Sequence, residues 1–223
     1  MSYLRKVLAI VWKDVRAELR TKDILSSMLV FAGLSVLIFQ FAFDLRADNV
    51  RLVLPGVLWI AITFAGVLGL NRSFILEQDR GSLEGLLLAP VDRSAIYFGK
   101  LIGNLLFIFI VELLLLPLMT LLFNVWLLSP ALLLVVALGT VGYAAVGTLF
   151  AALSINTRAR EVMLPILLFP VMVPVFVAGV QAVSRLLDGD SLADIVRWVQ
   201  LLVAYDAIFL AAAMLLFDYV VEE

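Results

Sequence analysis

The chain has 223 residues, of which 64% are hydrophobic and 15% charged, and its formal net charge is −2. A soluble protein of that composition would expose too much apolar surface, so the composition favours a membrane protein. The chain has no histidine and no cysteine. This excludes disulfides, Ser-His or Cys-His catalytic sites, and metal or haem ligation by imidazole or thiolate from this chain. No basic groove interleaved with aromatic residues is present, so we expect no nucleic-acid partner.

Residues 1–23 predict an amphipathic helix lying in the membrane interface, with Trp12 at the level of the headgroups. Charges are scattered through the segment, which argues against a cleaved signal peptide. The apolar residues recur at spacings of three and four, and the charged residues fill the remaining arc. The apolar set is Leu4, Val7, Leu8, Val11, Val15 and Leu19; the charged set is Arg5, Lys6, Lys13, Asp14, Arg16 and Arg20. A frayed, solvated N-terminus is the alternative.

Six nearly uncharged segments are long enough to cross a bilayer, because about 20 helical residues cover the roughly 30 Å hydrocarbon core. They are apolar on every side, whereas the strands of a membrane barrel alternate in polarity. We therefore expect an all-α integral membrane protein with a single transmembrane domain over residues 1–223. The predicted spans are 24–43, 52–70, 101–122, 130–153, 162–183 and 198–219.

The cations are distributed unequally between the two sides of these spans. Twelve of the 16 Lys and Arg residues fall in the N-terminal segment and in the second and fourth connections, and four fall in the first and fifth. Because Lys and Arg near the ends of spans are retained in the cytoplasm, we expect both termini to be cytoplasmic. The fifth connection, with Asp188, Asp190 and Asp194, is then a solvated outer loop.

The second connection, Asn71–Lys100, is the longest segment outside the spans and is too short to bury a core of its own. A short helix is predicted over residues 82–89, which Ser82 can cap and Pro90 ends. Its leucines share one face: Leu83, Leu86 and Leu87. We interpret the segment as a coupling helix, through which a cytoplasmic partner can move the two adjoining spans. A passive interfacial hairpin is the alternative.

Two carboxylates, Glu112 and Asp206, lie inside predicted spans, where each costs on the order of 2.5–3.5 kcal/mol at a helix centre. Such residues face the interior of a bundle, and we expect these two at a similar height in the membrane. They can be protonated, hydrogen-bonded to Asn104 or Gln181, or turned towards a partner subunit. The functional hypothesis for the pair is a proton or substrate pathway.

Small residues and prolines mark sites of close packing and of bending. The pair Gly99 and Gly103, and the glycines of the fourth span, allow helix backbones to approach each other. Three prolines in the fifth span should bend or break that helix, with a static kink as the alternative; they are Pro165, Pro170 and Pro174. The chain has no GxxxxGK[ST] phosphate-binding loop, so any ATP that drives it binds to another chain.

Four motifs are spread along the chain. They are Leu54-Pro55-Gly56 with Trp59, the run Asp79-Arg80-Gly81-Ser82-Leu83-Glu84 followed by Leu86-Leu87-Leu88 and Pro90, the segment Ala95 to Lys100, and the pair Pro170 and Pro174. Together these motifs resemble the permease subunit of the cytochrome c maturation ABC transporter, known as haem exporter protein B or CcmB. Arg80 departs from the acidic residue expected at that position, and Glu112 and Asp206 match no motif of the family.

The resemblance implies a non-catalytic ABC-2 type permease in the bacterial cytoplasmic membrane. Expected partners are an ABC ATPase, a second copy of the chain, a haem-handling membrane protein and a small membrane subunit. This chain alone would bind no cofactor: ATP belongs to the ATPase, whose hydrolysis helps release the haem-loaded chaperone, and haem is handled by the complex. The residues expected to contact the ATPase are Gly81, Ser82, Leu83, Glu84, Leu86, Leu87 and Pro90.

Three alternatives remain open at this point. The first is an ABC-2 permease for a drug, a lipid or a polysaccharide. The second is a proton-coupled secondary transporter, which would require Glu112 or Asp206. The third is a structural scaffold for an assembly complex.

Overall fold

The computed structural model describes residues 2–42, 47–79, 91–154 and 159–220. Regular secondary structure within these ranges is entirely helical, which confirms the predicted all-α class. The helices are α1 (Tyr3–Thr21), α2 (Asp23–Ala42), α3 (Ala47–Asp79), α5 (Arg93–Phe123), α6 (Pro130–Ser154), α7 (Arg160–Leu187) and α8 (Val196–Val220).

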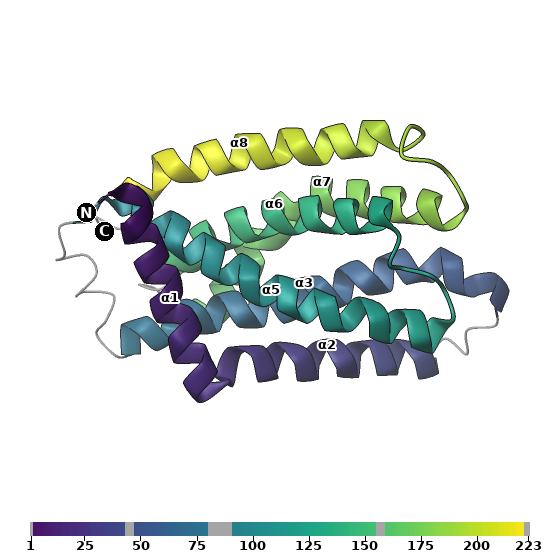
Figure 1. The fold of residues 1–223 in the computed structure, drawn as a ribbon, viewed down its shortest axis with the longest axis horizontal. Coiled ribbons are helices and arrows are strands. Elements are labelled where there is room, and N and C mark those ends of the chain that lie inside the picture. The colour runs from purple at the N-terminus through teal and green to yellow at the C-terminus, as the bar shows by residue number, and fades with distance from the viewer. Residues whose placement is uncertain (1, 43–46, 80–90, 155–158, 221–223) are drawn as a thin grey trace.

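All helices except α1 run side by side as a bundle, and α1 lies across them near one end (Figure 1). Each of the six bundle helices contains a segment long and apolar enough to cross a membrane, which confirms the expected class of a helical membrane protein with six spans. These segments are Asp23–Ala42, Val50–Ile75, Arg93–Phe123, Pro130–Ser154, Val162–Leu187 and Val196–Phe217. The start of α1 and the end of α8 lie at the same end of the bundle, as an even number of crossings requires.

The helices on either side of the second connection are longer than the predicted spans. The second span was expected over 52–70, but α3 continues to Asp79; the third was expected over 101–122, but α5 already begins at Arg93. Charged residues do not end these helices, because each helix satisfies its own backbone hydrogen bonds on leaving the apolar layer. The coupling segment 82–89, with Gly81 and Pro90, lies outside the described residues, so its predicted helix stays a prediction.

The three prolines of the fifth span do not break it. Helix α7 is continuous from Arg160 to Leu187, with Pro165, Pro170 and Pro174 inside it. Neighbouring helices α3, α6 and α8 pack along α7 and hold it where backbone hydrogen bonds are lost. The predicted break of this helix is therefore wrong, and the predicted bend stays a prediction.

Helix α6 is the centre of the bundle and packs against α3, α5, α7 and α8. Its glycines accept large side chains from neighbouring helices: Trp59 lies against Gly139, Tyr205 against Gly142 and Leu70 against Gly147. The predicted close packing at small residues is thus confirmed. The apolar residues left exposed on the outer helices, such as Leu34 on α2 and Leu215 on α8, form the surface that lipid would cover.

Candidate functional site

Helix α1 crosses α5 at two glycines one helical turn apart. A Cβ atom at Gly99 would lie 2.7 Å from Cγ2 and 2.8 Å from Cβ of Ile10, so only glycine leaves room for the isoleucine. At Gly103 a Cβ atom would lie 3.5 Å from Oδ2 of Asp14, which is ordinary contact. The close approach predicted at Gly99 and Gly103 is confirmed, and the helix that uses it is α1.

Polar contacts along the same crossing hold α1 to the start of α5. Lys100 Nζ lies 3.0 Å from Asp14 Oδ2, and the lysine side chain is only 1% exposed. The ammonium group also stands 5.3 Å from the centroid of the Phe74 ring on α3. Nearer the chain start, Lys6 Nζ lies 3.5 Å from Asp92 Oδ2. Removing one partner of a buried ion pair costs roughly 3–5 kcal/mol, so the Lys100–Asp14 pair is the strongest of these links.

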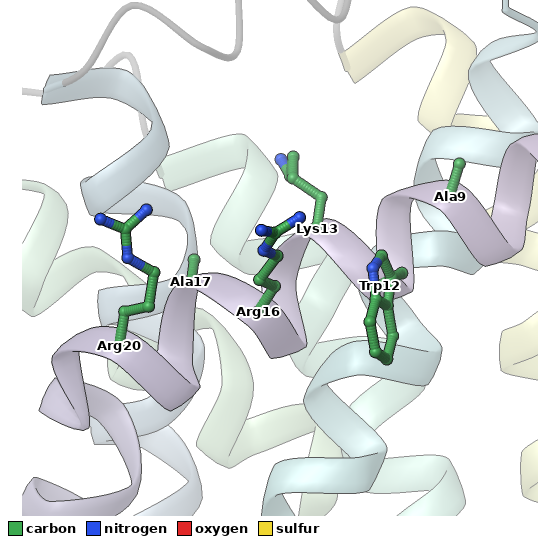
Figure 2. A pocket seen from close by; sticks show the side chains of 6 residues that line it. All are labelled: Ala9, Trp12, Lys13, Arg16, Ala17 and Arg20. Atoms are coloured by element: carbon green, nitrogen blue, oxygen red, sulfur yellow. The ribbon is translucent and has the colours of Figure 1, made fainter.

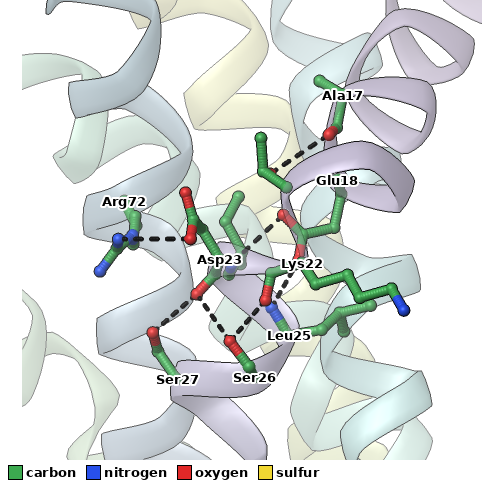
Figure 3. Close-up of polar contacts among 10 residues, drawn as sticks. Ala17, Glu18, Lys22, Asp23, Leu25, Ser26, Ser27 and Arg72 are labelled. Carbon is green, nitrogen blue, oxygen red and sulfur yellow. Dashed lines mark hydrogen bonds and ion pairs between the residues drawn. The ribbon is translucent and has the colours of Figure 1, made fainter.

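The corner between α1 and α2 is fixed by Glu18, which is 2% exposed. Its carboxylate accepts backbone hydrogen bonds from Ile24 (3.2 Å) and Leu25 (2.8 Å), and so caps the start of α2 (Figure 3). A negative charge at a helix N-terminus is stabilised by the helix dipole. Lys22 makes the turn in the left-handed region (φ 56°), and its amide donates to the Glu18 carbonyl at 2.7 Å. The direction of α1 relative to α2 is therefore set by one carboxylate.

The observed faces of α1 differ in part from the predicted ones. A helix forms here, so the frayed N-terminus is wrong. Asp14, expected on the polar arc, faces α5 because buried Lys100 requires a partner. Of the apolar set, Val7 is buried against the bundle together with Ile10. Leu4, Leu8, Leu19 and Trp12 are instead exposed, with exposed fractions of 62% to 71%. The apolar residues of α1 are thus divided between a face packed on the bundle and an exposed face.

The two intramembrane carboxylates face the interior, as predicted: Glu112 is 4% exposed and Asp206 is 7% exposed. The hydroxyl of Thr140 on α6 donates to Glu112. Asp206 lies against Gly142, two residues further along α6. Two residues correspond to about 3 Å of helix rise, so the expected similar height is confirmed.

One of the three alternatives for these carboxylates, hydrogen bonding to Asn104 or Gln181, is wrong for the described residues. Asn104 donates instead to Thr148 Oγ1 at 3.0 Å, because α5 and α6 bring these two residues together. Gln181 is exposed on α7. Within the described part of the chain, Oδ1 of Asp206 is buried and has no hydrogen-bond partner. No cluster of acidic residues among the described ones could hold a metal ion.

Of the motif on α3, Pro55 and Trp59 are buried and Gly56 is half-buried. The Trp59 indole sits against Gly139 of α6 and Gly179 of α7, and its Nε1 has no hydrogen-bond partner among the described residues. An apolar pocket of about 290 Å³ opens beside it between α3 and α7. The pocket is lined by Gly56, Trp59, Ile60, Thr63, Phe64, Phe169, Phe176 and Val180.

The two prolines of the family pair do not line this pocket. Pro170 and Pro174 are exposed on the outer side of α7. The structure therefore places Trp59 beside Gly179 of α7 but leaves the two prolines on the surface of the bundle.

The contacts of four residues were not predicted from the sequence: Asp14, Glu18, Lys100 and Thr140. A signal for the two acidic residues among them was present. A helical wheel places Asp14 between Ile10 and Val7, and Glu18 between Val7 and Val11, inside the apolar arc. An acidic residue inside an apolar arc needs a partner in the structure it packs against. No comparable signal pointed to Thr140.

The described chain is a multi-pass helical membrane protein with an amphipathic N-terminal helix held against the start of its third span. A family model described as "CcmB protein" matches residues 5–221. The chain therefore belongs to the CcmB family, which confirms the resemblance noted in its motifs.

Curated relatives carry the name "Heme exporter protein B". The protein of Pseudomonas aeruginosa is 26% identical over 193 residues, covering 86% of each chain. That of Rhodobacter capsulatus is 28% identical over 184 residues, covering 81% of this chain and 84% of the relative. That of Paracoccus denitrificans is 28% identical over 183 residues, covering 79% and 82%.

Proposed function

We propose that this chain is the permease subunit of an ATP-driven haem export system that serves cytochrome c maturation in the bacterial inner membrane. The observation that carries the proposal is the CcmB family match over residues 5–221, supported by relatives named Heme exporter protein B. The six membrane-spanning segments agree with a permease. ATP hydrolysis belongs to a separate chain, since this one lacks a phosphate-binding loop.

The structure supports a mechanical route from such an ATPase into the bundle. The segment 82–89 is followed directly by the start of α5, which α1 grips through Ile10, Asp14 and Lys6. Helix α1 in turn is fixed to α2 through Glu18. A displacement of the 82–89 segment would therefore move α5, α1 and α2 together. With α3 entering the same connection, the ATPase would act on four of the seven described helices.

The other partners follow from the same assignment. Six spans form half of a usual ABC pore, so two copies of this chain are expected in the complex. Any imidazole ligand for haem must come from a partner, because this chain contains no histidine. The haem-handling membrane protein and the small membrane subunit implied by the family would supply that chemistry.

Co-purification tests the proposal. A tagged wild-type chain should bring down a P-loop ATPase, and Leu86→Asp or Leu87→Asp should abolish this association without preventing membrane insertion. Leu192→Asp is the matched control, because Leu192 lies in the connection between α7 and α8 at the other end of the bundle and is 46% exposed. Intact ATPase binding by both Leu86 and Leu87 variants would contradict the coupling role. Normal cytochrome c maturation after deletion of the gene would contradict the assignment itself.

A further inference from the structure

The polar side of α1 carries a cluster of cations that the coupling route does not use. Figure 2 shows the charged ends of Lys13, Arg16 and Arg20 on one side of α1, with the Trp12 ring extending the opposite way. We call Lys13, Arg16 and Arg20, together with Trp12, the cationic shelf. They line a shallow depression of about 380 Å³ with two small residues, Ala9 and Ala17.

The acidic residues of α1 leave most of this charge uncompensated, because both are turned towards the bundle. Asp14 pairs with Lys100 and Glu18 caps α2. Lys13 lies 3.3 Å from Asp14. In the described part of the chain, no carboxylate forms an ion pair with Arg16 or Arg20. The two exposed guanidinium groups of Arg16 and Arg20 therefore have no ion-pair partner among the described residues.

An exposed apolar strip adjoins the cations along α1. It consists of Leu4, Leu8, Leu19 and Trp12, each more than 60% exposed. On a helical wheel, Trp12 lies between Leu19 and Arg16, so the exposed apolar residues lie directly beside the cations. Because α1 lies across the spans, this boundary runs along the membrane surface rather than through it. An apolar strip beside unpaired cations is complementary to one ligand in particular, a lipid with a negative headgroup.

We propose that the cationic shelf binds an anionic phospholipid of the membrane that the bundle crosses. Guanidinium groups form paired, charge-assisted hydrogen bonds with phosphate oxygens, which suits Arg16 and Arg20 to the headgroup. Ala9 and Ala17 leave room for the headgroup between the longer side chains. The Trp12 ring lies against the first carbons of the acyl chains. A lipid bound there would anchor α1, and with it the start of α5, at a defined depth.

Native mass spectrometry of the full-length protein in a neutral detergent tests this proposal. The protein is titrated with phosphatidylglycerol, and phosphatidylcholine serves as the reference without net charge. Each basic residue near an anionic lipid contributes about fivefold in affinity, so Arg16→Gln/Arg20→Gln should weaken phosphatidylglycerol binding on the order of twentyfold. Binding of phosphatidylcholine should not change. Arg16→Lys/Arg20→Lys keeps the charge and should retain most of the affinity.

The matched control is Arg185→Gln/Arg197→Gln, which removes the same charge from two exposed arginines at the opposite end of the bundle. This variant should bind phosphatidylglycerol like the wild type. Unchanged binding by Arg16→Gln/Arg20→Gln, at a native melting temperature, would overturn the proposal. If Arg16→Gln/Arg20→Gln lost ATPase co-purification while its lipid binding was unchanged, the proposal would also be overturned. The cationic shelf would then contact an acidic protein surface instead of a lipid. If the double variant melts early, the single variants give the same comparison with about fivefold effects.

Discussion

Lys100 of α5 and Asp14 of α1 form an ion pair of 3.0 Å in which the lysine is 1% exposed and the aspartate 10%. The pair joins the interfacial helix to the helix that follows the proposed coupling segment. Asp14→Asn would leave a buried ammonium group without its counter-charge, which costs roughly 3–5 kcal/mol. We expect a marked loss of melting temperature in detergent.

The double variant Asp14→Asn/Lys100→Met should recover much of this loss, because it leaves no buried charge unpaired. The control is Lys6→Met, which removes a partly exposed pair of 3.5 Å worth at most about 1 kcal/mol. Equal losses of melting temperature in Asp14→Asn and Lys6→Met would contradict a larger contribution of the Lys100–Asp14 pair to stability.

Gly99→Ala should displace α1 from α5. The added Cβ would lie 2.8 Å from Cβ of Ile10, which the branched side chain cannot avoid by changing rotamer. Gly103→Ala is the matched control on the same face, since its Cβ meets Asp14 only at ordinary contact distance. Limited proteolysis of α1 in membranes should be faster for Gly99→Ala than for Gly103→Ala. Adding Ile10→Ala to Gly99→Ala should restore protection, and failure to do so would argue against direct contact.

Glu18→Ala should loosen the corner between α1 and α2. It removes both side-chain acceptors for the amides of Ile24 and Leu25, and lost caps of this kind cost about 1–2 kcal/mol. Asp23→Ala, whose partly exposed carboxylate lies 3.9 Å from Arg72, should cost under about 1 kcal/mol. Thermal unfolding of both variants measures the difference. A larger effect at Asp23 would contradict the capping role of Glu18.

Glu112→Gln should leave cytochrome c maturation intact, because the amide oxygen can still accept the Thr140 hydrogen bond. We expect the same for Asp206→Asn, whose Oδ1 has no partner to lose among the described residues. Measured cytochrome c yield in a complemented deletion strain is the readout. Loss of function in either variant, with normal membrane levels, would favour the proton-coupled alternative over the ATP-driven one.

Much of this architecture could be predicted because it depends on properties that one helix carries alone. Long apolar runs give the six spans, and Gly99 with Gly103 marks a close approach whatever helix makes it. The direction in which α1 docks could not be predicted, because it depends on which acidic residue meets Lys100. Likewise Thr140 reaches Glu112 only because α5 and α6 are adjacent, which no pattern within either helix reveals.

The indole of Trp59 fills notches in two different helices, Gly139 of α6 and Gly179 of α7. Neither α6 nor α7 can slide along α3 without displacing the Trp59 ring from the space beside its glycine. Any rearrangement of the bundle that keeps this contact would therefore carry α3, α6 and α7 together as one body.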